Sequence, residues 1–334
     1  MPHSITRRDF LWRSVAGGSA VSALFGDWPS AAARVAARDK FSGIFAILQT
    51  PFNPSDQLDW EDLGREVDFC VRAGAHGLVW PQLAGEFYLL SEEERCHGAE
   101  VILRTTAGRR PIVIGVQAPS SSLALKFAQH AEKQGATAVI ALPPFLGSVN
   151  LETVAAYYRT LAQGITLPIF VQNSGAPWGP ALPTEFVIQM AIQNPQLAYV
   201  KEEVAPVGQR IGDYAHSGAM KGIFSGNAGR NLLDELAHGA AGTMPACEFI
   251  DVSVQVYELA AQSKLQEARA IFEKLLPMIN LEEIYGLHFT KEVLVRRGVF
   301  KTAKLRGVAG GGLDDQDQKE LDAWWKELAP YLKV

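Results

Sequence analysis

The chain has 334 residues, 48% of them hydrophobic and 20% charged, which is enough apolar material for one large core. A formal net charge of -5 gives no electrostatic footprint for binding nucleic acid. The three cysteines form no CxxC pair, which argues against a zinc site or a disulfide framework.

The first 33 residues have the features of an export signal. Arg7 and Arg8 stand ahead of a Phe-Leu pair, a pattern that resembles the twin-arginine signal, and a weakly apolar stretch follows over residues 15–25. Three alanines at residues 31–33 offer small side chains to a signal peptidase. The apolar stretch is too short to span a membrane. We therefore expect residues 1–33 to direct export to the periplasm or the medium, and the mature protein to contain no membrane span.

From residue 41, short apolar runs alternate with amphipathic segments, which is typical of repeated strand–helix units. Strands are expected over residues 44–48, 76–80, 111–116, 137–142, 167–172, 197–201, 221–225 and 241–244. Helices are expected over residues 58–72, 91–105, 121–134, 151–163, 183–193, 230–238 and 249–261. No helix is assigned between the sixth and seventh strands. Ser91 and Glu94 form a capping box at the start of the second helix.

Eight strands in about 220 residues predict a (β/α)8 (TIM) barrel over residues 41–262. The main rival is an open doubly wound sheet, but no GxGxxG follows the first strand. Further helices are expected over residues 264–277, 281–297 and 315–331, which would make a C-terminal helical region over 263–334. The glycine-rich stretch 307–312 has no strand before it and is expected to be a flexible joint.

The sixth strand ends in Lys201. A lysine at the C-terminal end of a barrel strand would point into the mouth of the barrel. Burial there disfavours the ammonium form, so its pKa would fall from roughly 10.4 and the free amine could act as a Schiff-base nucleophile. Most strand-end lysines extend into solvent instead, and the strand taken alone favours that alternative. Strand alternation places Tyr199, Lys201 and Glu203 on one side, and Val200 and Glu202 on the other.

Several motifs recur in a fixed order along the chain: Gly43 to Phe52, Gly85-Glu86, Pro143-Pro144-Phe145, Lys201-Glu202, Phe224-Ser225-Gly226, Gly239 to Gly242, and Lys291 to Leu294. Over about residues 41–300, their order and spacing resemble the dihydrodipicolinate synthase / N-acetylneuraminate lyase family of class I aldolases. The resemblance implies that the Lys201 amine attacks the ketone of a 2-oxo acid such as pyruvate or a sugar-acid derivative. The resulting imine is an electron sink for making or breaking a neighbouring bond. It also implies a homo-oligomer, either a dimer or a tetramer, and chemistry that needs no metal or cofactor.

The chain departs from the family pattern at its proton-relay positions. The family has Gly-Thr-Thr before its Gly-Glu pair, where this chain has residues 82–84, Gln-Leu-Ala. A family tyrosine after the strand-four motif is replaced by Leu146, and the acid/base tyrosine at the end of strand five by Gln172. An arginine that often helps to bind the carboxylate falls near Pro177 and is absent. The usual hydroxyl relay is therefore missing.

The catalytic residues expected here are Lys201, Gln172 and Glu203. Neutral Gln172 can orient a group but cannot transfer a proton near neutral pH. Glu203 has the correct strand parity to do so, and Tyr88 or His97 could approach from the segment after strand two.

Substrate binding is assigned partly to backbone and partly to apolar side chains. The N–H groups of Ala84 and Gly85 can hold a carboxylate without any particular side chain. The apolar residues around them favour a bulky or less hydroxylated 2-oxo acid. The assigned residues are Leu83, Ala84, Gly85, Phe145, Leu146, Asn173, Gly226 and Asn227, with Trp80 and Trp178 as further candidates.

Three interpretations stay open on the sequence. The chain is a Schiff-base lyase with different proton carriers, a degenerate aldolase that binds a carbonyl or carboxylate ligand without turnover, or a TIM-barrel enzyme of unrelated chemistry. Two other acidic residues are expected to be structural: Glu86 as a carboxylate that caps loop amides, and Glu202 as an outward, helix-facing group.

Overall fold

The computed structural model describes residues 41–147, 149–307 and 311–334. The described residues belong to one compact unit. The predicted export signal, and part of the predicted joint at residues 307–312, lie outside them. Within the described ranges, no helix is both long and apolar enough to cross a membrane.

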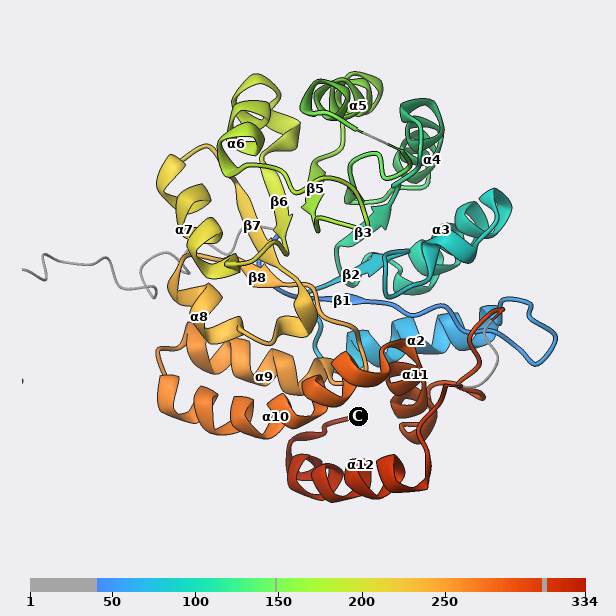
Figure 1. Ribbon diagram of the computed structural model, residues 1–334. Coiled ribbons are helices and arrows are strands. Elements are labelled where there is room, and N and C mark those ends of the chain that lie inside the picture. Colours follow the sequence, from blue (N-terminus) through green and yellow to red (C-terminus); the bar gives the residue numbers. More distant parts are fainter. Residues whose placement is uncertain (1–40, 148, 308–310) are drawn as a thin grey trace, which may run out of the picture. The chain divides into compact units, whose positions relative to one another are not determined.

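Eight parallel strands close into a barrel in sequential order, which confirms the predicted fold (Figure 1). The first strand pairs with the last, with Gly43 opposite Gly242. The strands are β1 (Gly43–Ile47), β2 (Gly77–Trp80), β3 (Ile112–Gly115), β4 (Ala138–Ala141), β5 (Ile169–Asn173), β6 (Tyr199–Glu202), β7 (Gly222–Ser225) and β8 (Gly242–Thr243).

Helices follow the strands and form a layer outside the barrel. They are α2 (Trp60–Arg72), α3 (Glu92–Thr106), α4 (Ser121–Lys133), α5 (Leu151–Gly164), α6 (Thr184–Gln193), α7 (Val207–Ser217), α8 (Leu232–Ala237) and α9 (Ile250–Ala261). Short 3-10 turns lie at η1 (Phe87–Leu89), η2 (Pro195–Leu197) and η3 (Asn227–Gly229). The predicted capping box of Ser91 and Glu94 is present at the start of α3. Helix α7 fills the gap that the sequence prediction left between strands six and seven.

The barrel interior has an apolar cluster of its own. Phe41, Phe45, Phe170, Tyr199 and Phe224 belong to it, and the Phe45 and Phe224 ring centroids are 5.1 Å apart. Residues that alternate with these along the strands, such as Val171 and Val200, belong to the cluster between strands and helices. This alternation confirms the parity predicted for the sixth strand, because Tyr199 is inside and Val200 outside.

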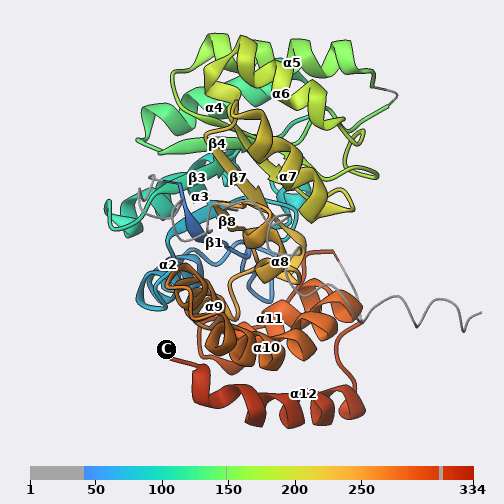
Figure 2. The ribbon, with the colours of Figure 1, turned by 90° about the vertical axis from the view of Figure 1, so that its left-hand side faces the viewer.

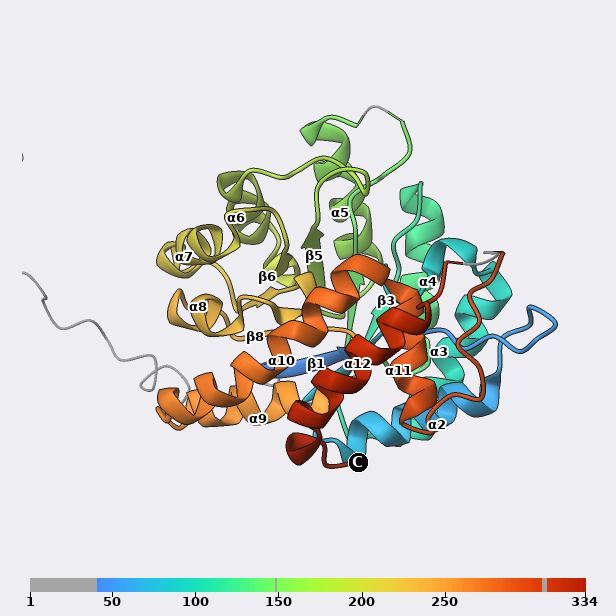
Figure 3. The same cartoon turned by 60° about the horizontal axis from the view of Figure 1, so that its bottom comes forward.

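The C-terminal helices α10 (Leu265–Tyr285), α11 (Leu287–Arg296) and α12 (Asp315–Leu328) lie on the α9 side of the barrel, as Figures 2 and 3 show. The predicted break after residue 277 is wrong: α10 continues through Pro277, and the chain turns at Gly286, whose φ is 55°. Proline removes one helical hydrogen bond, but buried Leu275 and Met278 hold the helix on both sides. The last turn, η4 (Ala329–Tyr331), follows α12.

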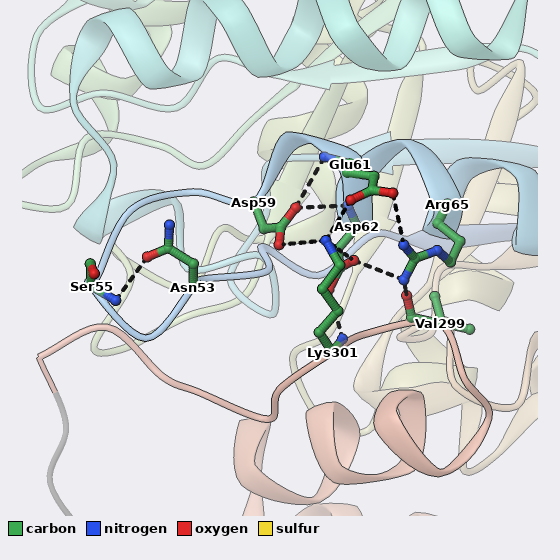
Figure 4. A network of polar contacts seen from close by, with 8 residues as sticks. All are labelled: Asn53, Ser55, Asp59, Glu61, Asp62, Arg65, Val299 and Lys301. Carbon is green, nitrogen blue, oxygen red and sulfur yellow. Dashed lines mark hydrogen bonds and ion pairs between the residues drawn. The ribbon is translucent and has the colours of Figure 1, made fainter.

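A polar network ties the start of α2 to the segment after α11 (Figure 4). The Lys301 Nζ lies 3.1 Å from Asp59 Oδ2 and 2.6 Å from Glu61 Oε2, and the Lys301 N–H donates to Asp62 Oδ2. Arg65 Nη1 donates to the Val299 carbonyl at 3.0 Å. The C-terminal region is thus joined to the start of the first helix by ion pairs and hydrogen bonds.

Candidate active site

Three predicted catalytic residues meet at the C-terminal end of the barrel. Lys201 pairs in register with Gln172 of β5 and Phe224 of β7, and is only 3% exposed. Its Nζ lies 3.1 Å from Oε1 of Glu203. The other oxygen of Glu203 accepts a hydrogen bond from Gln172 Nε2 at 2.8 Å. The active sites of TIM-barrel enzymes lie at this end of the strands.

The surroundings of Glu203 favour its ionised form. Burial raises the pKa of this carboxyl, but the charge of Lys201 and hydrogen bonds from Gln172, Lys201 and Ser174 outweigh burial, so the net pKa lies below its usual value. A carboxylate next to an amine can accept a proton and later return it. Glu203 can therefore act as the proton carrier, a role that the neutral amide of Gln172 cannot fill.

Two residues predicted to bind substrate contact Glu203 in the structure. A Cβ at Gly226 would lie 2.1 Å from Glu203 Oε1, so a glycine is needed for the carboxylate to occupy its place. Asn227 Nδ2 donates to the Glu203 carbonyl at 3.2 Å. These contacts give Gly226 and Asn227 a role in positioning Glu203.

The opposite face of β6 carries a separate network, as predicted for Glu202. This buried carboxylate accepts hydrogen bonds from the Tyr214 hydroxyl at 2.8 Å and from Asn173 Nδ2 at 2.9 Å, and it lies 3.2 Å from Arg210 Nε. Asn173 also exchanges hydrogen bonds with the Leu182 backbone. Its side chain therefore belongs to this outer network and not to the Lys201 side, which differs from its predicted contact with substrate.

The segment after β2 is held by its own turn and by a distant lysine. Ala84 packs against the inner barrel cluster, whereas the preceding residue, Leu83, lies in the turn itself. The Gly85 N–H donates to the Gln82 carbonyl at 3.0 Å, so this amide is not available for the anion site predicted on it. A Cβ at Gly85 would lie 2.9 Å from the Leu48 carbonyl oxygen, which explains the glycine.

Glu86, next in the chain, is fully buried and forms an ion pair with Lys291 of α11. Lys291 Nζ also donates to the Lys304 carbonyl at 3.0 Å and lies 4.6 Å from the centre of the Phe52 ring. Glu86 also accepts a hydrogen bond from the backbone N–H of Arg306, so the prediction that it caps a loop amide holds, and the ion pair with Lys291 is an addition that the sequence did not indicate. Its carboxylate needs a cation because it is removed from water, and the C-terminal region supplies one.

Four aromatic side chains gather from the segments that follow β2, β4 and β5. Phe87 lies 5.7 Å from both Phe145 and Trp178, between ring centroids, and Tyr88 stacks on Trp178 at 5.2 Å. We call these four residues the aromatic cap. The neighbouring Leu146 is 66% exposed and lies outside the cap.

Two other residues that were predicted to contribute to the active site, His97 and Trp80, lie elsewhere. His97 packs against the Trp60 ring, and its Nδ1 is 3.6 Å from Glu100 Oε2, so it is not a proton carrier for Lys201. Trp80 faces outward, where a Cβ at Gly98 would meet its ring at 2.2 Å. Successive side chains of a strand point to opposite faces, and the preceding Val79 points into the barrel, so Trp80 must point outward.

Sequence reasoning missed three fully buried glutamines at the same end of the barrel: Gln49, Gln82 and Gln117. Gln49 stands two residues after the inward-facing Ile47, and Gln117 two residues after Gly115 at the end of β3. Gln82 Nε2 donates to Gln117 Oε1 at 3.2 Å, and Gln117 Nε2 donates to the Pro81 carbonyl at 2.9 Å. Extending the alternation of strands one and three beyond their last residues would have identified Gln49 and Gln117.

The chain is similar to several known proteins over most of its length. A model of the dihydrodipicolinate synthetase family matches residues 40–327. L-2-keto-3-deoxyarabonate dehydratase of Azospirillum brasilense is 30% identical over 261 residues, which cover 77% of this chain and 84% of that protein. A probable 2-dehydro-3-deoxy-D-pentonate aldolase of Escherichia coli is 30% identical over 252 residues, which cover 74% and 83%.

Solved structures agree with this likeness. The crystal structure of dihydrodipicolinate synthase from Rhodopseudomonas palustris has a TM-score of 0.80 at 26% identity, covering 86% of this chain and 98% of that one. This likeness counts against the interpretation as a TIM-barrel enzyme of unrelated chemistry. By sequence, fold and the position of Lys201 at the end of β6, the chain belongs to the dihydrodipicolinate synthetase family.

Proposed function

We propose that the protein is a lyase that forms a Schiff base between Lys201 and a 2-oxo acid. The observation that carries the proposal is the buried Lys201–Glu203 pair, 3.1 Å apart, at the C-terminal end of the barrel. Membership of a family of aldolases and lyases supports it. The names of two relatives, a dehydratase and a probable aldolase of 2-keto-3-deoxy sugar acids, support both the 2-oxo acid and the cleavage chemistry.

In the proposed reaction, Glu203 takes a proton from Lys201, and the free amine adds to the ketone carbon of the substrate. The ketone oxygen leaves as water, with one proton from the amine and one returned by Glu203. In C–C cleavage, Glu203 takes the proton of the C4 hydroxyl, C4 becomes a carbonyl carbon, and the C3–C4 electron pair moves into the protonated imine to give an enamine. In dehydration, Glu203 takes a proton from C3, the C–H electron pair moves into the imine, and the enamine then expels the C4 hydroxyl, which leaves as water with the proton from Glu203. Gln172 keeps Glu203 in place through its 2.8 Å hydrogen bond. Replacement of the family tyrosine by Gln172 therefore leaves a proton carrier in the site.

Borohydride trapping tests the proposal. Pyruvate or a longer 2-oxo acid at pH 7 to 8, followed by borohydride, should fix an adduct on the peptide that contains Lys201 and on no other lysine. Lys201→Ala and Lys201→Arg should both abolish labelling, since a guanidinium stays protonated and cannot attack a ketone. Lys221→Arg is the matched control, because this exposed lysine lies just before β7, at the other end of the barrel.

The variant Glu203→Gln distinguishes the role of Lys201 as nucleophile from the role of Glu203 as proton carrier. It should slow turnover of a cleavable 2-oxo acid by about 10²–10⁴-fold, the usual contribution of a positioned acid or base. The adduct on Lys201 should form more slowly, because Glu203 also frees the amine, but it should still form on long incubation. Labelling of the wild type without turnover of any 2-oxo acid would instead identify a binding protein. Labelling of another lysine, or of none, in the folded protein would refute the Schiff base.

A further inference from the structure

We propose that Cys70 and Cys247 are a redox site: on oxidation they form a disulfide that locks the place where the barrel closes. Both cysteines are free in the structure, and both side chains are fully buried. Their thiols are hydrogen-bonded to each other. This site is separate from the Schiff-base chemistry proposed for Lys201 and does not depend on it.

A second contact places the two cysteines side by side. Cys247 Sγ donates a hydrogen bond to Glu66 Oε1 at 2.9 Å, and Glu66 precedes Cys70 by one turn of α2, on the same buried face. Cys247 comes directly after Ala246, which pairs with Ile47 at the end of β1. The last segment of the barrel wall is therefore held against the face of the first helix that contains Cys70. A disulfide requires the two sulfurs to move from hydrogen-bond contact to about 2.0 Å, which is a local shift of side chains.

The pair lies next to the most weakly hydrogen-bonded part of the barrel. Strand β8 has two residues, and its registers with β1 and with β7 each cover two residue pairs. The registers between the other neighbouring strands cover three or four. A Cys70–Cys247 bond would close a loop that contains strands β2 to β8. Because a crosslink across a long loop removes much freedom from the unfolded chain, it would stabilise this closure.

The oxidation can be written as two exchanges with a small disulfide such as oxidised glutathione. One cysteine attacks a sulfur of the oxidant, which releases its first thiol, and the other cysteine then attacks the mixed disulfide, which releases the second. The proton that each cysteine loses goes to the thiolate that leaves. Glu66 keeps the hydrogen bond from the Gln49 N–H and loses the one from Cys247.

Two conditions decide when this reaction occurs. Burial raises the pKa of both thiols, so exchange should be slow while the core is closed and faster when α2 and the segment after β8 separate transiently. The export signal predicted for residues 1–33 would bring the protein to a compartment in which disulfides persist. The reduced form would then belong to the cytoplasm and the oxidised form to the periplasm or the medium.

The test incubates the reduced full chain with oxidised glutathione at pH 8, in urea just below the unfolding transition. After alkylation in denaturant, mass spectrometry of unreduced peptides should find Cys70 linked to Cys247, with only Cys96 alkylated. Oxidation should raise the urea midpoint by about 1 M, and dithiothreitol should reverse the shift. Cys96→Ser, on α3, is the matched control and should keep both the link and the shift. Cys70→Ala, and Cys247→Ser with a hydroxyl that still donates to Glu66, should lose both.

Three alkylated cysteines after this treatment would overturn the inference. Glutathione bound to Cys70 or Cys247 without a link between them would also overturn it, since the sulfurs would then be unable to reach each other. A linked peptide without a change in the urea midpoint would refute the effect on barrel closure. If neither single variant folds, the oxidised and reduced forms of the wild type and of Cys96→Ser still give the comparison.

Discussion

Glu66 of α2 is the group whose replacement should change the pH dependence of stability most clearly. One carboxyl oxygen accepts hydrogen bonds from the Gln49 N–H at 2.8 Å and from Cys247 Sγ at 2.9 Å, and the other has no partner among the described residues. Burial raises the pKa of Glu66 to about 8, more than these hydrogen bonds and the charge of Lys291 lower it. The folded protein therefore holds this carboxyl protonated at neutral pH.

The direction of this pH dependence follows from comparing the folded and the unfolded chain. Between the ordinary pKa of 4.5 and the folded value of about 8, the unfolded chain has released a proton that the folded chain retains. Stability therefore falls as the pH rises through this window, by about 1.4 kcal/mol per pH unit and by at most about 5 kcal/mol in all. Glu66→Gln has no proton to lose, so it should be far less sensitive to pH over this range. Relative to the wild type, the variant should gain up to about 5 kcal/mol between pH 4 and pH 9.

Urea unfolding followed by circular dichroism at pH 4, 6.5 and 9 measures this difference. Other buried acids contribute equally to both proteins and cancel in the comparison. Glu267→Gln, which removes an exposed carboxyl from α10, is the control and should shift the midpoint by a similar amount at every pH. A Glu66→Gln effect that is the same at pH 4 and pH 9 would show that Glu66 is ionised in the folded protein and would refute the reasoning.

Three further outcomes are expected. Lys291→Met should lower the free energy of unfolding by about 3–5 kcal/mol, because it removes the ion-pair partner of the buried Glu86 carboxylate. Adding Glu86→Gln should recover most of that loss in urea unfolding, and a double variant no more stable than the single one would contradict this. Changing Arg7 and Arg8 to lysine should keep the protein in the cytoplasm, and undiminished export in a fractionation experiment would refute the twin-arginine signal. Light scattering should give the mass of a homotetramer, a dimer of dimers as the family resemblance implies, and a monomeric mass at micromolar concentration would exclude it.

Local pattern was enough to predict most of the fold. Alternation in β6 placed Lys201 and Glu203 on one face and Glu202 on the other, and the structure agrees. Helix α7 was missed because Gly208 and Gly212 lower helix propensity, although Val207, Ile211 and Tyr214 do recur at helical spacing and are buried. The break expected at Pro277 failed because burial on both sides of that residue outweighs one lost hydrogen bond.

The site was harder to predict, because its polar groups lie far apart in the sequence and only the closing of the barrel brings them to one end. Gln49, Gln82 and Gln172 come from three segments far apart in the sequence, and a glutamine at the end of a strand resembles any other polar loop residue. Apolar neighbours such as Leu83 and Phe145 are conspicuous in the sequence, and the prediction of a bulky or less hydroxylated 2-oxo acid rests on them. The ion pair of Glu86 with Lys291 was not predicted, because nothing near Glu86 in the chain indicates a cation.

The partner of Glu86 is synthesised late. Lys291 follows it by 205 residues, after every strand of the barrel. During translation, the turn that contains Leu83, Ala84 and Gly85 is therefore made long before Lys291. The Glu86 carboxylate next to this turn gains its ion-pair partner only when the C-terminal helices have been synthesised. A chain cut after α9 would contain all eight strands but not Lys291, so Glu86, at the same end of the barrel as Lys201, would lack its ion-pair partner. We expect competence for the reaction to arise only when the last helices dock, so a stalled or truncated chain would be inactive.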